Sequence, residues 1–212
     1  MNQHIYKRRP VGSDAIPTVI FFLLIANGLL YAAQQFDPFG DLLARYFALW
    51  PLKSAFADFY PWQLVTYGFL HSTQDLMHLV FNMFMLWMFG RELEVLMGVR
   101  RFLTYYLTCV AGAGLVQLIV ANITGSPYPT VGASGGVFGL LLAFGMAFPN
   151  RMILLLFPPI PMKAKYMVIL FGLLELYMGL SGTTPGIANF AHLGGMLFGY
   201  LLIRRWKNAR RR

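Results

Sequence analysis

Residues 102–123 read FLTYYLTCVAGAGLVQLIVANI, and residues 133–148 read ASGGVFGLLLAFGMAF. The first stretch contains no charged residue and matches the roughly 20 residues that cross a hydrocarbon core about 30 Å thick. The whole chain of 212 residues is 58% hydrophobic and 12% charged, whereas an ordinary soluble domain is roughly a quarter charged. These features predict a polytopic membrane protein.

Working outward from these two stretches, we find four more apolar segments of similar character. The sequence therefore predicts an all-α membrane protein, a single bundle of six transmembrane helices over residues 16–35, 75–90, 102–123, 133–148, 164–180 and 187–204. The fourth segment is short and opens on small residues. We expect it to begin below the membrane surface and to leave a water-filled hollow above it.

The formal net charge is +9, and the positions of the 17 Lys and Arg residues explain it without a nucleic-acid partner. If the six spans alternate in direction, only Arg45 and Lys53 lie on one side of the membrane. The positive-inside rule then places both termini in the cytoplasm and requires an even number of spans. We therefore expect an integral membrane protein. The remaining basic residues, all on the cytoplasmic side, are Lys7, Arg8, Arg9, Arg91, Arg100, Arg101, Arg151, Lys163, Lys165, Arg204, Arg205, Lys207, Arg210, Arg211 and Arg212.

Three parts of the chain follow from this topology. Residues 1–15 are predicted to form a cytoplasmic tail, residues 16–204 the helical domain, and residues 205–212 a basic tail suited to anionic lipid headgroups. The longest connection, residues 36–74, is rich in Trp and Tyr and is expected to be a structured loop at the outer interface. The single cysteine, Cys109, is expected to be a small packing residue.

Few polar residues with reactive side chains lie within the predicted spans, and each is a candidate functional group because ionisable groups are costly there. His78 and Asn82 lie in the second span, Ser134 opens the fourth, and His192 lies about five residues into the sixth. Spans two, four and six run in the same direction. Their early residues therefore share a depth in the outer part of the membrane, where they could meet.

These side chains supply the parts of a nucleophilic site. A serine hydroxyl such as that of Ser134 needs a base, and the imidazole of His192 serves near neutral pH. His78 and Asn82 are four residues apart on one helix face, where they could stabilise an oxyanion. The backbone N–H of Ser134, at a helix N-terminus, is a further donor.

Small residues favour close packing of the fourth and sixth spans. Gly135 and Gly139 form one pair at a spacing of four, and Gly195 and Gly199 form another on the face of His192. In a glycine-rich membrane protein such pairs alone often indicate packing only.

Several simpler interpretations stand beside this one. A lone serine or histidine in a span is more often a packing residue than a catalytic one, and Glu175 is expected to be mainly structural, either held by a neighbouring helix or lying near water. His71 and Asp75 are expected to shape the outer loop. Gly132-x-Ser134-x-Gly136 also matches the nucleophile elbow of soluble hydrolases, but no strand precedes it. No His-Glu-x-x-His motif is present, and no pair of intramembrane aspartates occurs.

The motifs together resemble the rhomboid family of intramembrane serine proteases. The resemblance covers about residues 60–200 and rests on three segments in family order, with Glu94-x-x-x-Gly98 as a further similarity. The segments are His78-Leu79-Val80-Phe81-Asn82, Gly132-Ala133-Ser134-Gly135, and Ala191-His192-Leu193-Gly194-Gly195 with Gly199.

The resemblance implies a six-helix rhomboid bundle and a serine endopeptidase with a Ser134–His192 dyad, without a third acid, metal or cofactor. The six-span form resembles the one typical of bacteria, which implies a bacterial inner membrane. The resemblance also implies that His78, Asn82 and the Ser134 amide stabilise the oxyanion, and that Phe138 packs against the base. The implied substrates are single-span membrane proteins in the bilayer, cut near their outer end.

The chain departs from the family at Trp62-Gln63, where many relatives carry Trp-Arg, and in a longer interval between His71 and His78. A noncatalytic rhomboid-like protein that binds or moves membrane clients is the alternative; its sign would be loss of the dyad, and both members are present. The sequence does not indicate the oligomeric state or the physiological substrate.

Overall fold

A helix occupies each of the six segments predicted to span the membrane. The computed structural model describes residues 17–155, 159–183 and 188–209. The six helices are α1 (Thr18–Gln34), α4 (Leu76–Met97), α5 (Val99–Thr124), α6 (Ser134–Ala147), α7 (Ala164–Ser181) and α8 (Asn189–Ala209). Three short elements lie between α1 and α4: α2 (Phe39–Phe47), α3 (Gln63–Thr66) and the 3-10 helix η2 (Tyr67–Phe69). The strands β1 (Met152–Leu154) and β2 (Pro161–Lys163) pair antiparallel between α6 and α7.

Several helices run further than the apolar segments that predict them, and the difference is largest for α4 and α8. The second was expected to end at residue 90, and α4 continues to Met97. The basic tail was expected from residue 205, and α8 continues to Ala209. Apolar composition marks the hydrocarbon region, whereas a helix continues into the interface as long as its backbone stays hydrogen-bonded. The predicted N-terminal tail, residues 1–15, lies outside the described residues.

The surface of the bundle is apolar over much of its length. By length and composition, α5 and α7 could each cross a membrane, and α1 and α6 are shorter apolar helices. Large side chains face outward on α1 and α7, among them Leu29, Leu173 and Leu180, which are 67%, 61% and 73% exposed. A soluble monomer rarely exposes an apolar surface so extensive. The outward faces of these helices therefore suit a lipid environment.

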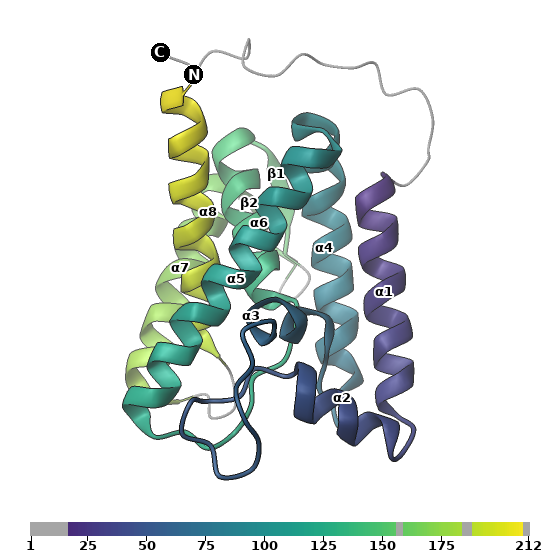
Figure 1. The fold of residues 1–212 in the computed structure, drawn as a ribbon. Helices are drawn as coiled ribbons and strands as arrows, with labels where there is room; N and C mark the ends of the chain where they lie inside the picture. The colour runs from purple at the N-terminus through teal and green to yellow at the C-terminus, as the bar shows by residue number, and fades with distance from the viewer. Residues whose placement is uncertain (1–16, 156–158, 184–187, 210–212) are drawn as a thin grey trace.

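The centre of the bundle is α6, which packs against α4, α5, α7 and α8 (Figure 1). Its Leu140 and Phe144 join a continuous core with Phe89 of α4 and with Tyr105 and Tyr106 of α5. The beginning of α1 and the end of α8 lie at the same end of the bundle, and α2 lies at the other (Figure 1). This arrangement fits six alternating helices.

The long connection between α1 and α4 is ordered by hydrogen bonds. The indole N–H groups of Trp50 and Trp62 donate to the carbonyl oxygens of Ala44 and Tyr46 at 2.9 and 2.8 Å. Leu49 pairs with Thr130 in an isolated β-bridge, which joins this loop to the segment before α6. The predicted structured loop is therefore present, and it is connected to the segment that carries Ser134.

Two carboxylates cap the N-termini of helices by accepting hydrogen bonds from backbone N–H groups. Asp75 caps α4 by accepting from the Met77 backbone N–H at 2.9 Å. Glu94, near the end of α4, accepts from the backbone N–H groups of Val19 and Ile20 at 3.0 and 2.9 Å. These two N–H groups lie in the first turn of α1 and have no partner within that helix. A buried side chain of α4 therefore caps α1.

Candidate active site

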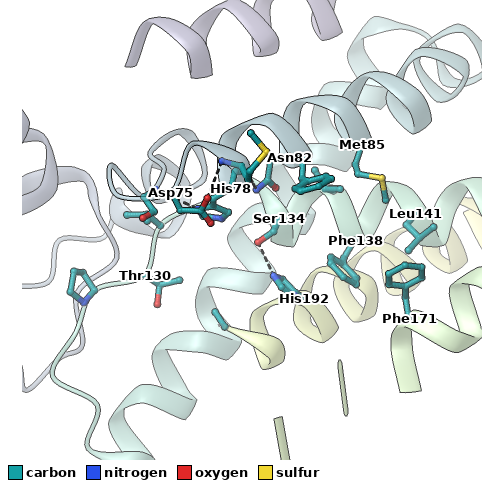
Figure 2. Close-up of a pocket in the computed structure, with 17 residues that line it drawn as sticks. Asp75, His78, Asn82, Met85, Thr130, Ser134, Phe138, Leu141, Phe171 and His192 are labelled. Atoms are coloured by element: carbon teal, nitrogen blue, oxygen red, sulfur yellow. Dashed lines mark hydrogen bonds between the residues drawn. The ribbon is translucent and has the colours of Figure 1, made fainter. Parts of the chain in front are cut away.

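Ser134 is the first residue of α6, and its hydroxyl faces the imidazole of His192 on α8 (Figure 2). The distance between Ser134 Oγ and His192 Nε2 is 2.8 Å. His192 is 8% exposed. At this distance Nε2 accepts the hydroxyl proton if the other ring nitrogen carries the N–H. The pair has the geometry of a nucleophile and its base.

The imidazole is packed against Phe138, one turn beyond Ser134 on the same helix. The two ring centroids are 4.3 Å apart and the planes differ by 3°. The ring of Phe138 in turn meets Phe171 of α7 edge-on, with centroids 6.4 Å apart. One face of the His192 ring is thus supported by an aromatic side chain, at the position where the family resemblance implies one.

The carboxylate of Glu175, which the sequence did not connect with the site, lies beside the other ring nitrogen of His192, Nδ1. Glu175 of α7 is 6% exposed, and its Oε2 is 2.8 Å from His192 Nδ1. The ring N–H does not point straight at this oxygen, so the contact is close without being a well-directed hydrogen bond. The same oxygen accepts from Asn189 Nδ2 at 2.7 Å. Of the two expected surroundings for Glu175, the structure shows the neighbouring helix, and its contacts there include the His192 ring.

His78 and Asn82 lie on α4 on the opposite side of Ser134 (Figure 2). Ser72 donates its backbone N–H to His78 Nδ1 at 3.3 Å. In a neutral ring Nε2 then carries the hydrogen, so that the His78 edge beside Ser134 is a donor. Asn82 donates one amide N–H to the His78 carbonyl at 2.7 Å, and its side chain lines the same pocket.

Gly132 allows this approach. Its φ is +129°, a conformation that side chains disfavour. A Cβ at this position would lie 2.9 Å from the His78 ring and 3.7 Å from Ser134 Oγ. A larger residue would therefore separate the imidazole from the serine.

The glycines of α6 and α8 bring the two helix backbones together. A Cβ on Gly195 would overlap the carbonyl of Gly135, and one on Gly139 would lie 3.2 Å from the Gly195 carbonyl oxygen while overlapping Cys109. Gly199 faces the hydroxyl of Tyr105 on α5 rather than α6. Cys109 is fully buried in this contact, as a packing residue is expected to be.

His71 lies next to the site without joining the pocket. Its ring centroid is 5.2 Å from that of His78, and its backbone exchanges two hydrogen bonds with the Gln34 side chain of α1 at 2.9 and 3.0 Å. Burial lowers the pKa of His71 to about 3, with the neighbouring His78 as a second cause. A neutral His71 that joins α1 to the loop agrees with the expectation that it shapes this region.

The pocket over Ser134 has a volume of about 600 Å³. Ser134, His192, His78 and Asn82 form one polar part of its lining. Another part is apolar and includes the side chains of Met85, Phe138, Leu141 and Phe171 (Figure 2). Such a pocket offers both hydrogen-bond donors and an apolar surface to a ligand. Among the described residues no group of three His, Cys, Asp or Glu side chains is placed to hold a metal ion.

Comparison with known proteins gives a consistent result. Residues 58–206 match the Rhomboid domain family. The chain is 27% identical over 209 residues, 93% of its length, to "Rhomboid protein 1, mitochondrial" of Saccharomyces cerevisiae, of which the match covers 58%. It is 32% identical over 187 residues, 88% of its length, to "Rhomboid protease GluP" of Bacillus subtilis, of which the match covers 32%. The chain thus spans between one third and three fifths of the length of these relatives.

Proposed function

Because the chain belongs to the rhomboid family, we propose that it is an intramembrane serine endopeptidase in which Ser134 is the nucleophile and His192 the general base. The observation that carries the proposal is the 2.8 Å contact between Ser134 Oγ and His192 Nε2 at the pocket. The two residues are 58 positions apart in the sequence. General packing does not require a serine hydroxyl and an imidazole to meet in an otherwise apolar bundle.

The reaction follows from the positions of these groups. Ser134 Oγ attacks the scissile carbonyl carbon while its proton passes to His192 Nε2. The tetrahedral intermediate collapses, the C–N bond breaks, and the imidazolium gives the proton to the leaving amine. Water then attacks the acyl-enzyme by the same proton path, which releases the carboxylate and restores the serine hydroxyl. The proposed reaction requires no metal or cofactor.

Three donors are available for the developing oxyanion. The Ser134 backbone N–H lies at the N-terminus of α6, where helical N–H groups have no helical partner. The His78 Nε2–H and the second amide N–H of Asn82 come from α4, across the pocket. In many enzymes, hydrogen-bond donors fixed in a site of low dielectric make the largest single contribution to the rate enhancement.

The six helices are proposed to be six spans of a bacterial inner membrane, with both termini on its cytoplasmic side. This proposal is supported by the basic residues that flank the expected inner ends and by the outward apolar faces of α1 and α7. The proposed substrates are single-span membrane proteins, as the family resemblance implies. A cut near their outer end is supported by the pocket lining, which includes Ser72, Pro129 and Thr130 from the loops on the α2 side.

Purified protein in detergent or liposomes provides the test. We expect the wild type to cleave a model transmembrane substrate and Ser134→Ala to leave it intact while retaining a normal melting temperature. A fluorophosphonate probe should label the wild type at Ser134, as located by peptide mass spectrometry. Undiminished cleavage by Ser134→Ala would exclude the proposed nucleophile. A folded wild type that binds clients without cutting any would instead indicate the noncatalytic alternative.

The orientation has a separate test. Tyr128, in the loop before α6, is 72% exposed. In a protein whose Cys109 has been replaced by Ala, Tyr128→Cys should react in intact cells with a thiol reagent that does not cross the membrane. Reaction only after lysis would contradict the proposed topology.

A further inference from the structure

The His192 ring has two nitrogens, and the proposed dyad uses only Nε2. Nδ1 is 2.8 Å from Oε2 of Glu175, a carboxylate that is itself buried. A carboxylate in the low-dielectric interior is strongly destabilised unless it has hydrogen-bond donors or a positive charge nearby. Asn189 supplies one donor at 2.7 Å.

We propose that Glu175 is a positioning residue for His192, with Asn189 holding its carboxylate in place, so that the site acts as a Glu–His–Ser triad. This inference rests on the proposed function and adds a third member to its dyad. Asn189 is three residues before His192 and therefore on the same face of α8. The two partners that the described residues give the Glu175 carboxylate thus come from one helix.

The carboxylate acts on the base in two ways. Before attack, an acceptor beside Nδ1 favours the tautomer with hydrogen on Nδ1, which leaves the Nε2 lone pair free to accept the Ser134 proton. After attack, His192 is an imidazolium, and the nearby negative charge stabilises it where the dielectric constant is low. The second effect exists only while the ring is charged, so it lowers the barrier rather than the ground state.

The supports of the ring come from different elements. Ser134 and Phe138 of α6 contact one nitrogen and one face, and Glu175 of α7 contacts the other nitrogen. Phe171 and Glu175 are four residues apart on α7, so one face of that helix reaches both Phe138 and His192. The other buried residues of α7, Ala164 and Met167, lie in its first turn. From residue 168 to the end of the helix Glu175 is the one buried residue, and Leu173 and Tyr177 beside it are 61% and 65% exposed.

The deciding variant is Glu175→Gln, which keeps the shape of the side chain and removes its charge. We expect kcat to fall about 10- to 100-fold with KM nearly unchanged. This loss is smaller than the roughly 10⁴-fold that follows the loss of a triad carboxylate when the wrong tautomer then forms. Asn189 should hold the glutamine oxygen toward the ring and preserve the tautomer. The melting temperature should stay the same or rise, because a buried charge is removed.

The matched control is Glu94→Gln, the same substitution at the other buried glutamate. Its carboxylate accepts from two backbone N–H groups of α1, so an amide would place a donor against a donor. We expect a lower melting temperature and an unchanged kcat per active site, with active sites counted by the end point of fluorophosphonate labelling. A purely structural role of Glu175 would give Glu175→Gln this same pattern and would overturn the proposal.

Two further variants keep the test decisive. If Glu175→Gln does not fold, Glu175→Asp retains the charge on a shorter side chain, and we expect a lower kcat in folded enzyme; wild-type kcat in that variant would overturn the inference. Ser134→Ala in the same assay separates the two proposals. Cleavage by Ser134→Ala contradicts the proposed function itself, whereas an inactive Ser134→Ala beside a fully active Glu175→Gln contradicts only the role of Glu175.

Discussion

Glu94 and Glu175 are the two glutamates buried in the described part of the chain, at 4% and 6% exposure, yet their surroundings differ. Glu94 has both oxygens on backbone N–H groups that are fixed by the start of α1. Glu175 has one oxygen on an amide and close to an imidazole. Backbone donors never change charge, whereas an imidazole does so during proton transfer. The partner of a buried carboxylate, rather than its burial, therefore indicates whether it serves stability or chemistry.

The largest expected effect comes from removing His192, the partner of Glu175 that can change its charge. His192→Ala should reduce turnover by roughly 10⁴- to 10⁶-fold, because the serine loses its base and the leaving amine its acid. The measurement is cleavage of a reconstituted transmembrane substrate, with folding checked by circular dichroism. If His192→Ala retains its turnover, His192 is not the base, and the contrast between a structural Glu94 and a catalytically important Glu175 fails.

The next effect belongs to the structural carboxylate. Glu94→Ala leaves two backbone N–H groups of α1 without an acceptor, at about 1–3 kcal/mol each, and should lower the melting temperature while leaving kcat per labelled active site unchanged.

The control lies two residues earlier on the same helix. Glu92 forms an exposed ion pair with Arg151 at 2.8 Å, which contributes about 0–1 kcal/mol, so Glu92→Ala should change the melting temperature little. Equal losses in Glu94→Ala and Glu92→Ala would show that the cap on α1 does not matter.

A smaller effect on turnover is expected at Asn82. Its neutral side chain raises the same question as the two glutamates, whether it serves stability or the reaction. Loss of one oxyanion donor lowers turnover by about 10²–10³ where that donor is dominant, and here the Ser134 amide and His78 remain. Asn82→Ala should therefore reduce kcat by less than about 100-fold, with KM and the melting temperature nearly unchanged. If the melting temperature falls and kcat does not, the hydrogen bond from Asn82 to the His78 carbonyl is structural, as at Glu94.

The smallest effect concerns the aromatic support of the base. A stacked ring contributes about 0.5–1.5 kcal/mol beyond its buried area, so Phe138→Leu should slow turnover by roughly 2- to 10-fold. Phe144→Leu, further along the same helix, is the control, since the Phe144 ring packs on that of Phe89, with centroids 5.2 Å apart, away from His192. It should lower stability without changing kcat. A larger rate loss in Phe144→Leu than in Phe138→Leu would contradict the assigned role.

Much of the fold could be predicted from the sequence because its signals are local. Apolar length places each helix, and alternating direction gives spans two, four and six a common depth. That was enough to bring Ser134, His192, His78 and Asn82 toward one place, and the structure puts all four around one pocket. The family motifs added the expected aromatic residue, Phe138, which stacks on the His192 ring.

The contacts of Glu94 and Glu175 could not be derived in this way. Each depends on the rotation of one helix about its axis relative to another, which apolar side chains alone do not determine. On α7, Leu173, Leu174 and Leu176 are all exposed by more than 40%, so composition does not mark an inner face. The available signal was the carboxylate itself, since a charge in a span requires a partner; the identity of that partner required the structure.

The glycine contact between α6 and α8 has a consequence for the response of this protein to membrane thickness. Helices adapt to a thicker or thinner bilayer chiefly by tilting. Two backbones already in contact through Gly135 and Gly195 have little freedom to tilt against each other, so the nucleophile and the base should keep their separation in short- and long-chain lipids alike. Helix α7 is restrained differently near Glu175, because its glycines there, Gly172 and Gly179, face side chains of α8 and not its backbone. Bilayer thickness would therefore reach the chemistry through one carboxylate, as a graded change in rate rather than as loss of the site.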